Sequence, residues 1–241
     1  MPLTVYAHPV SQPSRAVMWA LAMNKTEHDF KFIDILKGEA STDEYLGLFP
    51  AGGVPALDDG TVRLQEGGAI LTYLAETQGW EGLYPSKDAA KRAKINQWLH
   101  WHHEGSRQAT NLYIRPLLFG PVFGGKPADC VIEPFSNAKS PFRDVCLTLK
   151  FGALKDTKFL CGDDVTLADL SVYCEFDQLE AFGLLDIAGV AQDFPEVVAW
   201  MDRMKALPGH DEVRAALNEL GAKVKPLVAA LPPCNAAPKA E

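Results

Sequence analysis

The sequence lacks three features that would each define a class of protein. It contains no run of eighteen or more apolar residues, which excludes an obvious transmembrane helix. It has no cluster of lysine and arginine, and its 31 acidic against 23 basic residues leave a net charge of −8, so nucleic acid is not an expected partner. It does not begin with a basic segment followed by a long apolar stretch. We therefore expect a cytoplasmic protein without membrane or nucleic-acid partners.

Cysteine is scarce and irregularly spaced. No two cysteines form a C-x-x-C pair, the spacing typical of redox and zinc sites. The five are Cys130, Cys146, Cys161, Cys174 and Cys234. Their odd number and wide spacing predict reduced, mostly buried thiols in a reducing compartment.

The first 78 residues alternate between strand-like and helix-like patterns. Apolar and polar residues alternate over 3–7 and 30–35, whereas 13–23 and 67–77 have helical spacing. Val54 to Leu64, with an Asp-Asp-Gly turn in the middle, predicts a β-hairpin. With a short helix within 37–49, the order β-α-β-α-β-β-α predicts an α/β domain with a four-stranded mixed sheet over residues 1–78.

The rest of the chain is predicted to be helical. Residues 79–85 hold two glycines and a proline and form the predicted linker. Strand patterns almost vanish beyond it, so residues 86–225 are expected to form an all-α domain, with a Gly- and Pro-rich loop at 120–141. Thr166 and Asp169 form a capping box that begins one of its helices. Residues 226–241 are predicted to be a disordered tail.

A serine between the first strand and the first helix is a candidate catalytic residue. Ser11 lies just before a helix with Pro13 in its first turn, where the helix dipole favours an anion. A thiol is mostly protonated at neutral pH, and a hydroxyl donor at this position favours the nucleophilic thiolate. We therefore expect Ser11 to stabilise a thiolate. Ser14 is a second candidate donor, and a purely structural role as a helix cap is the alternative for Ser11.

Two further segments are suited to bind a peptide-like thiol through backbone groups. A cis bond between Val54 and Pro55 would leave the backbone of Val54 free to pair with an extended peptide, although an ordinary start of a strand is equally consistent. Glu66 and Gly67 begin a helix, where a carboxylate and free amides fit the ammonium and carboxylate of an amino acid. Glu66 could instead only complement the helix dipole.

Taken in order, these motifs resemble a theta-class glutathione transferase over roughly residues 3 to 205. The set comprises S-Q-P-S-R-A-V from Ser11, V-P-A-L from Val54, the acidic helix start at Glu66 and T-L-A-D-L from Thr166. The resemblance implies a thioredoxin-like first domain, an all-helical second domain, a homodimer and glutathione as cosubstrate. It implies conjugation of glutathione to small apolar electrophiles, as in detoxification, with hydroperoxide reduction as a further activity.

The resemblance also assigns roles to individual residues. It makes Ser11 the residue that stabilises the thiolate, Val54 with Pro55 the backbone partner of the cysteinyl residue, and Glu66 with Gly67 the γ-glutamyl site. Gln12 and Gly53 lie in the same glutathione-binding stretches.

In the second domain, Glu104 resembles the acid that reaches across the dimer, and Arg107 the arginine beside the electrophile. A solvated helix face is the alternative for both. His100, His102 and His103 lie nearby, but only His100 and His103 share a helix face, so no metal is expected.

Three positions depart from the theta pattern. Ala40 and Gly53 stand where a histidine and a lysine would hold the glycine carboxylate of glutathione, and Gly67 replaces a serine. Each missing hydrogen bond to a charged group is worth about 1.5–3 kcal/mol, so affinity falls unless Lys37, Gln12 or Arg107 compensates. The alternative to an enzyme is a non-catalytic binding module like the transferase-like domain of the translation elongation factor's gamma subunit.

Overall fold

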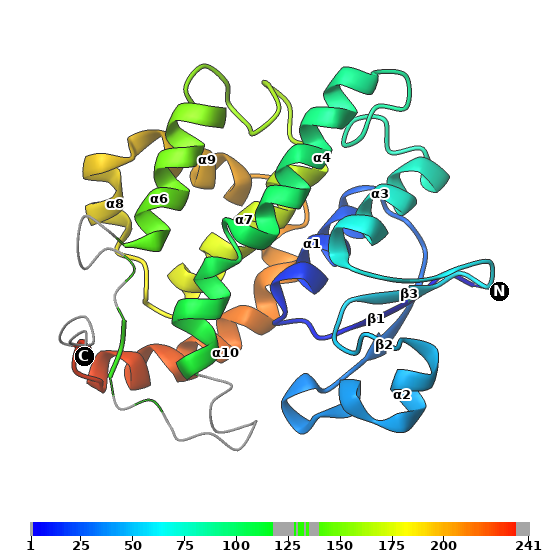
Figure 1. The fold of residues 1–241 in the computed structure, drawn as a ribbon, viewed down its shortest axis with the longest axis horizontal. Coiled ribbons are helices and arrows are strands. Elements are labelled where there is room, and N and C mark those ends of the chain that lie inside the picture. Colours follow the sequence, from blue (N-terminus) through cyan, green and yellow to red (C-terminus); the bar gives the residue numbers. More distant parts are fainter. Residues whose placement is uncertain (1, 118–127, 129, 133, 135–139, 235–241) are drawn as a thin grey trace, which may run out of the picture.

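The computed structural model describes residues 2–117, 128, 130–132, 134 and 140–234. In Figure 1 the chain forms a sheet-containing half at its N-terminal end and a helical half at its C-terminal end. This is the α/β thioredoxin-like domain followed by an all-α domain that the sequence predicts. Within the described part of the chain, none of the helices combines the length and apolar character that crossing a membrane requires.

The first domain is built on a four-stranded mixed sheet with strand order β2-β1-β3-β4. Its strands are β1 (Thr4–Ala7), β2 (Asp29–Phe32), β3 (Ala56–Asp58) and β4 (Arg63–Gln65). β1 pairs parallel with β2 and antiparallel with β3, and β3 pairs antiparallel with β4. The predicted hairpin is therefore present, and Gly60 with φ 82° allows its turn.

Helices α1 (Gln12–Met23) and α3 (Gly67–Gln78) pack together beside the sheet, while α2 (Asp43–Leu48) lies apart from them (Figure 1). Two short 3-10 turns, Ile35–Lys37 and Glu39–Ser41, precede α2. The buried side chains of α1 and α3 join the main core. The chain thus runs from the C-terminal end of β1 through residues 8–10 to Ser11, which lies immediately before α1.

The second domain follows a well-packed connection. Residues 79–85, predicted as a linker, bury Trp80, Leu83 and Tyr84. The named α-helices beyond it are α4 (Ala89–Glu104), α6 (Pro141–Thr148), α7 (Leu167–Ala181), α8 (Ile187–Asp193), α9 (Pro195–Lys205) and α10 (His210–Ala230). Two π-helical segments, η3 (Ala109–Ile114) and η4 (Leu149–Ala153), lie between them. Most of the loop predicted at 120–141 lies outside the described residues.

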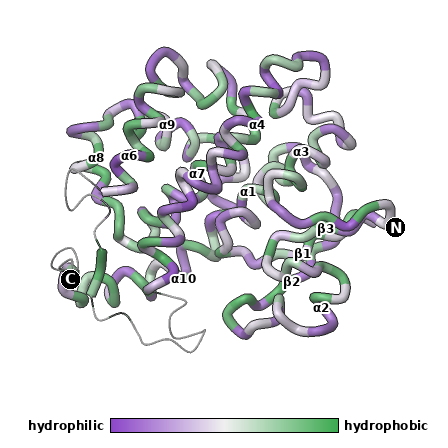
Figure 2. Tube along the Cα trace, in the orientation of Figure 1, coloured by the Kyte–Doolittle hydropathy of each residue, from purple (hydrophilic) through white to green (hydrophobic). Residues whose placement is uncertain are grey.

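Helix α7 is the centre of this domain, and nearly all of its residues are buried. The predicted capping box begins it: the Asp169 carboxylate accepts hydrogen bonds from the backbone N–H and hydroxyl of Thr166, at 2.9 and 2.8 Å. Figure 2 shows hydrophilic residues through the middle of the molecule, where α4 and α7 lie. A helix that is buried on all sides and carries polar residues needs hydrogen-bond or ion-pair partners for them inside the protein.

A buried ion pair joins the two domains. Arg15 of α1 and Asp177 of α7 are almost inaccessible to solvent, and their side chains form a hydrogen-bonded salt bridge. Arg214 of α10 donates to the other carboxylate oxygen of Asp177 at 2.6 Å. Because an uncompensated buried charge is very costly, this cluster holds α1 and α10 to α7.

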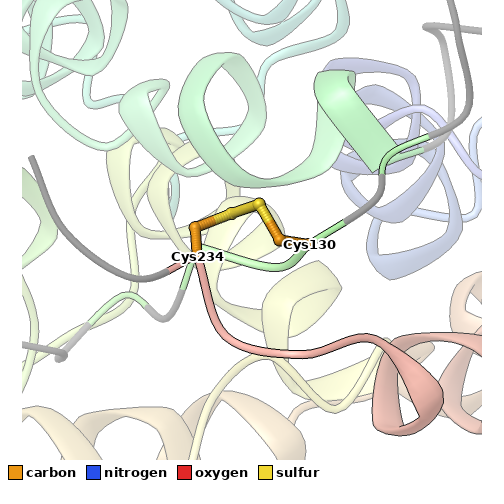
Figure 3. The surroundings of a disulfide bond; sticks show 2 residues. All are labelled: Cys130 and Cys234. Carbon is orange, nitrogen blue, oxygen red and sulfur yellow. A yellow bond between two sulfur atoms is a disulfide. The ribbon is translucent and has the colours of Figure 1, made fainter. Parts of the chain in front are cut away.

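The C-terminal segment corrects two predictions. Cys130 and Cys234 form a disulfide bond (Figure 3), so the expectation that every cysteine is reduced is wrong; Cys146, Cys161 and Cys174 are free. α10 continues through Ala230, and Val131 exchanges backbone hydrogen bonds with residues 232 and 234. The tail predicted as disordered is therefore ordered at 226–234, and 235–241 lie outside the described residues. Sequence spacing did not indicate this pairing because the two cysteines are 104 positions apart.

The disulfide should stabilise the fold, because it closes a long loop in the unfolded chain. Cys234→Ser is expected to lower the melting temperature by about 5–15 °C under oxidising conditions, which corresponds to about 2–4 kcal/mol. Thermal denaturation followed by circular dichroism measures this. Cys161→Ser, at a free and partly exposed cysteine, is the matched control, and equal melting of Cys234→Ser and wild type without reductant would contradict the prediction.

Candidate functional site

Ser11 lies immediately before α1 and lines a cavity of about 360 Å³, called here the Ser11 cavity. Its hydroxyl makes no capping hydrogen bond to α1, which argues against the purely structural role. Ser14, the second candidate, is fully buried, and its hydroxyl has no hydrogen-bond partner among the described residues. Of the two serines, Ser11 alone is placed to meet a ligand in this cavity.

The loop before β3 presents backbone groups to the same cavity. The Val54–Pro55 peptide bond is cis, as the sequence suggested. The Tyr45 hydroxyl donates to the Gly53 carbonyl at 2.7 Å, and the Gln65 side chain makes two hydrogen bonds of 3.0 Å to the preceding residues of the loop. No hydrogen bond of the Val54 backbone is present within the described residues. Its N–H and C=O are thus available to a peptide.

Glu66 holds a strained backbone conformation at the start of α3. Its φ of 71° with ψ of 113° is unusual for a residue with a side chain and costs about 1–3 kcal/mol, and such strain concentrates at functional sites. Glu66 and Gly67 line a second cavity of about 220 Å³, called here the Glu66 cavity. Gly53, Val54 and Arg107 line both cavities, so the two cavities adjoin, and together they are called here the cleft.

The three departures from the theta pattern have structural counterparts. A Cβ atom at Gly67 would lie 3.1 Å from Cβ of Pro13, closer than ordinary packing allows. Gly53 has φ 80°, a conformation that disfavours a lysine there. Ala40 is buried beside the Ser11 cavity and offers no polar group. Neither Ala40 nor Gly53 therefore offers the basic side chain that the resemblance implies at its position.

Glu175 of α7 is a site residue that sequence reasoning missed. It is fully buried, and its Oε1 atom is 2.9 Å from both Nε2 of His102 and Nη1 of Arg107. Thr110 donates to its Oε2 atom at 2.5 Å and accepts a hydrogen bond from the Gln12 side chain. The network runs from Glu175 to the residue next to Ser11. The sequence carries no separate signal for it, because Glu175 is one of several carboxylates in a helix that also holds Asp169, Asp177 and Glu180.

The charge of Glu175 is held by its neighbours. Burial opposes ionisation, but the Arg107 guanidinium and the hydrogen bonds from His102 and Thr110 outweigh it and lower the pKa of Glu175 to about 2. Arg107 is in turn fixed in orientation at the wall shared by both cavities. Glu175 thus positions Arg107 and, through Thr110, Gln12.

The remaining candidates occupy different surroundings. Glu104 is exposed at the end of α4 and lines neither cavity of its own chain. His103 lines the Glu66 cavity, and His100 is exposed. His102 is committed to Glu175. Within the described part of the chain, no group of three or more potential ligands is arranged to hold a metal ion.

The cleft combines a hydroxyl donor at a helix N-terminus, free backbone groups beside a cis-proline and a carboxylate at a second helix start. This arrangement can hold an extended peptide with its thiol near Ser11. Together with the fold, it defines a two-domain thiol-binding protein of the thioredoxin-like class.

Comparison with known proteins identifies the family. The family models "Glutathione S-transferase, N-terminal domain" and "Glutathione S-transferase, C-terminal domain" match residues 1–76 and 141–208. Glutathione S-transferase T1 of Arabidopsis thaliana is 32% identical to this chain, and the match covers 90% of this chain and 89% of the relative. Glutathione S-transferase theta-2 of Mus musculus is 30% identical, and the match covers 97% of this chain and 94% of the relative. The chain belongs to the glutathione S-transferase family, and the predicted likeness to the theta class is confirmed.

Solved structures agree with this assignment. Human glutathione transferase theta-2 in complex with glutathione and an unknown ligand superimposes with a TM-score of 0.80 at 29% identity, covering 95% of this chain and 92% of that one. A human theta-class glutathione transferase in complex with the glutathione conjugate of 1-menaphthyl sulfate also superimposes with a TM-score of 0.80. The two sequences are 28% identical, and the match covers 98% of this chain and 94% of that one.

The Glu175 network should make stability depend on pH in acid. A pKa of about 2 in the folded state, against an ordinary value of 4.5, means that Glu175 stabilises the fold fully above about pH 4.5 and loses this contribution as the pH falls toward 2. Glu175→Gln should therefore unfold more easily at pH 7 and lose less stability on acidification than wild type. Urea unfolding between pH 7 and pH 3 measures the free energy of unfolding at pH 7 and its decrease on acidification. Glu76→Gln, at an exposed glutamate, is the control. Parallel pH profiles for wild type and Glu175→Gln would contradict the assignment.

Proposed function

We propose that this protein conjugates glutathione to small apolar electrophiles, an activity suited to detoxification. The observation that carries the proposal is the Ser11 hydroxyl, which has no hydrogen-bond partner among the described residues and lies at the N-terminus of α1, in a cavity that adjoins the Glu66 cavity. Glutathione would lie with its γ-glutamyl end at Glu66 and Gly67 and its cysteinyl backbone at Val54. Its sulfur would then be near Ser11.

Each group has a defined part in the reaction. The thiol releases its proton to water, and the Ser11 hydroxyl donates a hydrogen bond to the thiolate at the positive end of α1. The sulfur attacks the electrophilic carbon, a C–S bond forms, and the leaving group departs with the electron pair of its bond. Arg107, fixed by Glu175, places a positive charge beside the electrophile.

Ser11→Ala should lower kcat much more than it weakens glutathione binding, because the hydroxyl favours the thiolate more than the bound thiol. We expect a loss of about 10²-fold in kcat, typical of removing one such donor, with Kd changed by less than about three-fold. Steady-state kinetics and calorimetry measure the two quantities. Ser14→Ala removes a buried, unpaired hydroxyl and is the control. A large loss in Ser14→Ala alone would move the role to Ser14, and no turnover in wild type would favour the non-catalytic binding module.

We also propose a homodimer in which Glu104 completes the partner's site. Glu104 is exposed and lies outside both cavities of its own chain, which supports action on a neighbouring copy. Cytoplasmic location remains a prediction from the sequence, and the Cys130–Cys234 disulfide is the observation against it.

The dimer is tested by sedimentation velocity at micromolar concentration, where we expect a single species of twice the chain mass. Mixing Ser11→Ala and Glu104→Gln chains then tests the exchange of Glu104. If Glu104 acts across the interface, each mixed dimer carries one doubly defective site and one wild-type site, so activity should exceed that of either variant alone. A monomer, or a mixture no more active than the average of its components, would refute this arrangement.

A further inference from the structure

The Ser11 cavity has a positive lining in a strongly acidic protein. Apolar side chains such as Val10, Leu36 and Leu220 form much of its wall. Its charged lining residues are Arg107 and Arg115, and no carboxylate lines it among the described residues. A net charge of −8 for the whole chain makes this local excess of positive charge a specific feature of the cavity.

The two arginines differ in what they are free to do. Arg107 is paired with the buried carboxylate of Glu175 at 2.9 Å, which holds its guanidinium in place and occupies one of its N–H donors. The Arg115 side chain is exposed and forms no ion pair or hydrogen bond with other described residues, while its backbone N–H donates to the Thr110 carbonyl. Lys37, another basic residue near this end of the cleft, is paired with Asp34 at 3.1 Å and does not line the cavity. Arg115 is thus the lining cation whose guanidinium remains available to a ligand.

Local backbone geometry explains why Arg115 faces the cavity. In an α-helix, residues five positions apart point about 140° away from each other. The π-helical segment Ala109–Ile114 widens the turn, and Thr110 and Arg115 both line the cavity while Tyr113 and Ile114 are buried. Widened turns of this kind are frequent at functional sites.

We propose that Arg115 is an anion-binding residue of this cavity and recognises a carboxylate or sulfonate group of a bound substrate. This inference rests on the proposed function for the identity of the thiol. Two sources can supply the anion. One is the glycine carboxylate of glutathione, whose expected basic partners are replaced by Ala40 and Gly53. The other is an acidic group on the electrophile, which would occupy the apolar wall and extend toward the guanidinium.

The test compares Arg115→Gln with Lys37→Gln, which removes the same charge outside the cavity. Calorimetry gives the Kd of each variant for glutathione, for glutathione amidated at its glycine end, and for two conjugates: the product of glutathione with 4-chloro-3-nitrobenzoate and the product with its methyl ester. Binding of conjugates requires no turnover, so failure of the proposed catalysis leaves this measurement intact.

If Arg115 binds the glycine carboxylate, Arg115→Gln should weaken glutathione roughly ten-fold and leave the amidated form unchanged. If it binds the electrophile's anion, the roughly ten-fold loss should appear for the benzoate conjugate and not for its ester. Either loss should shrink with added salt. Equal effects of Arg115→Gln and Lys37→Gln on every ligand, or no binding of any anionic ligand by wild type, would overturn the proposal. Wild type that binds the conjugates but shows no turnover would refute only the proposed function.

Discussion

The burial of α7 is the constraint on which the rest of the structure depends. This helix carries Glu175 and Asp177 in an interior where an uncompensated charge is very costly, so each carboxylate requires a cation from elsewhere in the chain. Asp177 obtains Arg15 from α1 and Arg214 from α10, whereas Glu175 obtains Arg107. The same requirement thus docks the two domains together and fixes an arginine at the wall of the cleft.

The cleft relies on backbone groups more than on side chains. Val54 has free backbone groups among the described residues and Glu66 has a strained conformation, while Ala40, Gly53 and Gly67 stand where the theta resemblance implies a histidine, a lysine and a serine. A peptide thiol can still be aligned, because backbone N–H and C=O groups need no particular residue type. The charged side chains that line the Ser11 cavity are Arg107 and Arg115, and we propose that they determine which anionic groups the site accepts.

The far end of the helical domain is held by a covalent bond in addition to packing. The Cys130–Cys234 disulfide and the hydrogen bonds of Val131 tie the segment after α10 to a distant part of the chain. Neither Cys130 nor Cys234 lines the Ser11 cavity or the Glu66 cavity. The disulfide acts on the stability of the C-terminal segment.

The sequence by itself determined the fold class, the hairpin, the capping box at Thr166 and the position of Ser11 before a helix, because these follow from local periodicity and turn chemistry. Only the tertiary structure showed the ion pairs of Glu175 and Asp177 and the place of Arg115 at the wall of the Ser11 cavity. The cations that pair with Glu175 and Asp177 come from other elements, and the direction of Arg115 depends on a π-helical segment. Contacts between distant elements and a π-helical segment leave no local sequence pattern. The disulfide was hidden for the same reason: its cysteines meet only when the chain is folded.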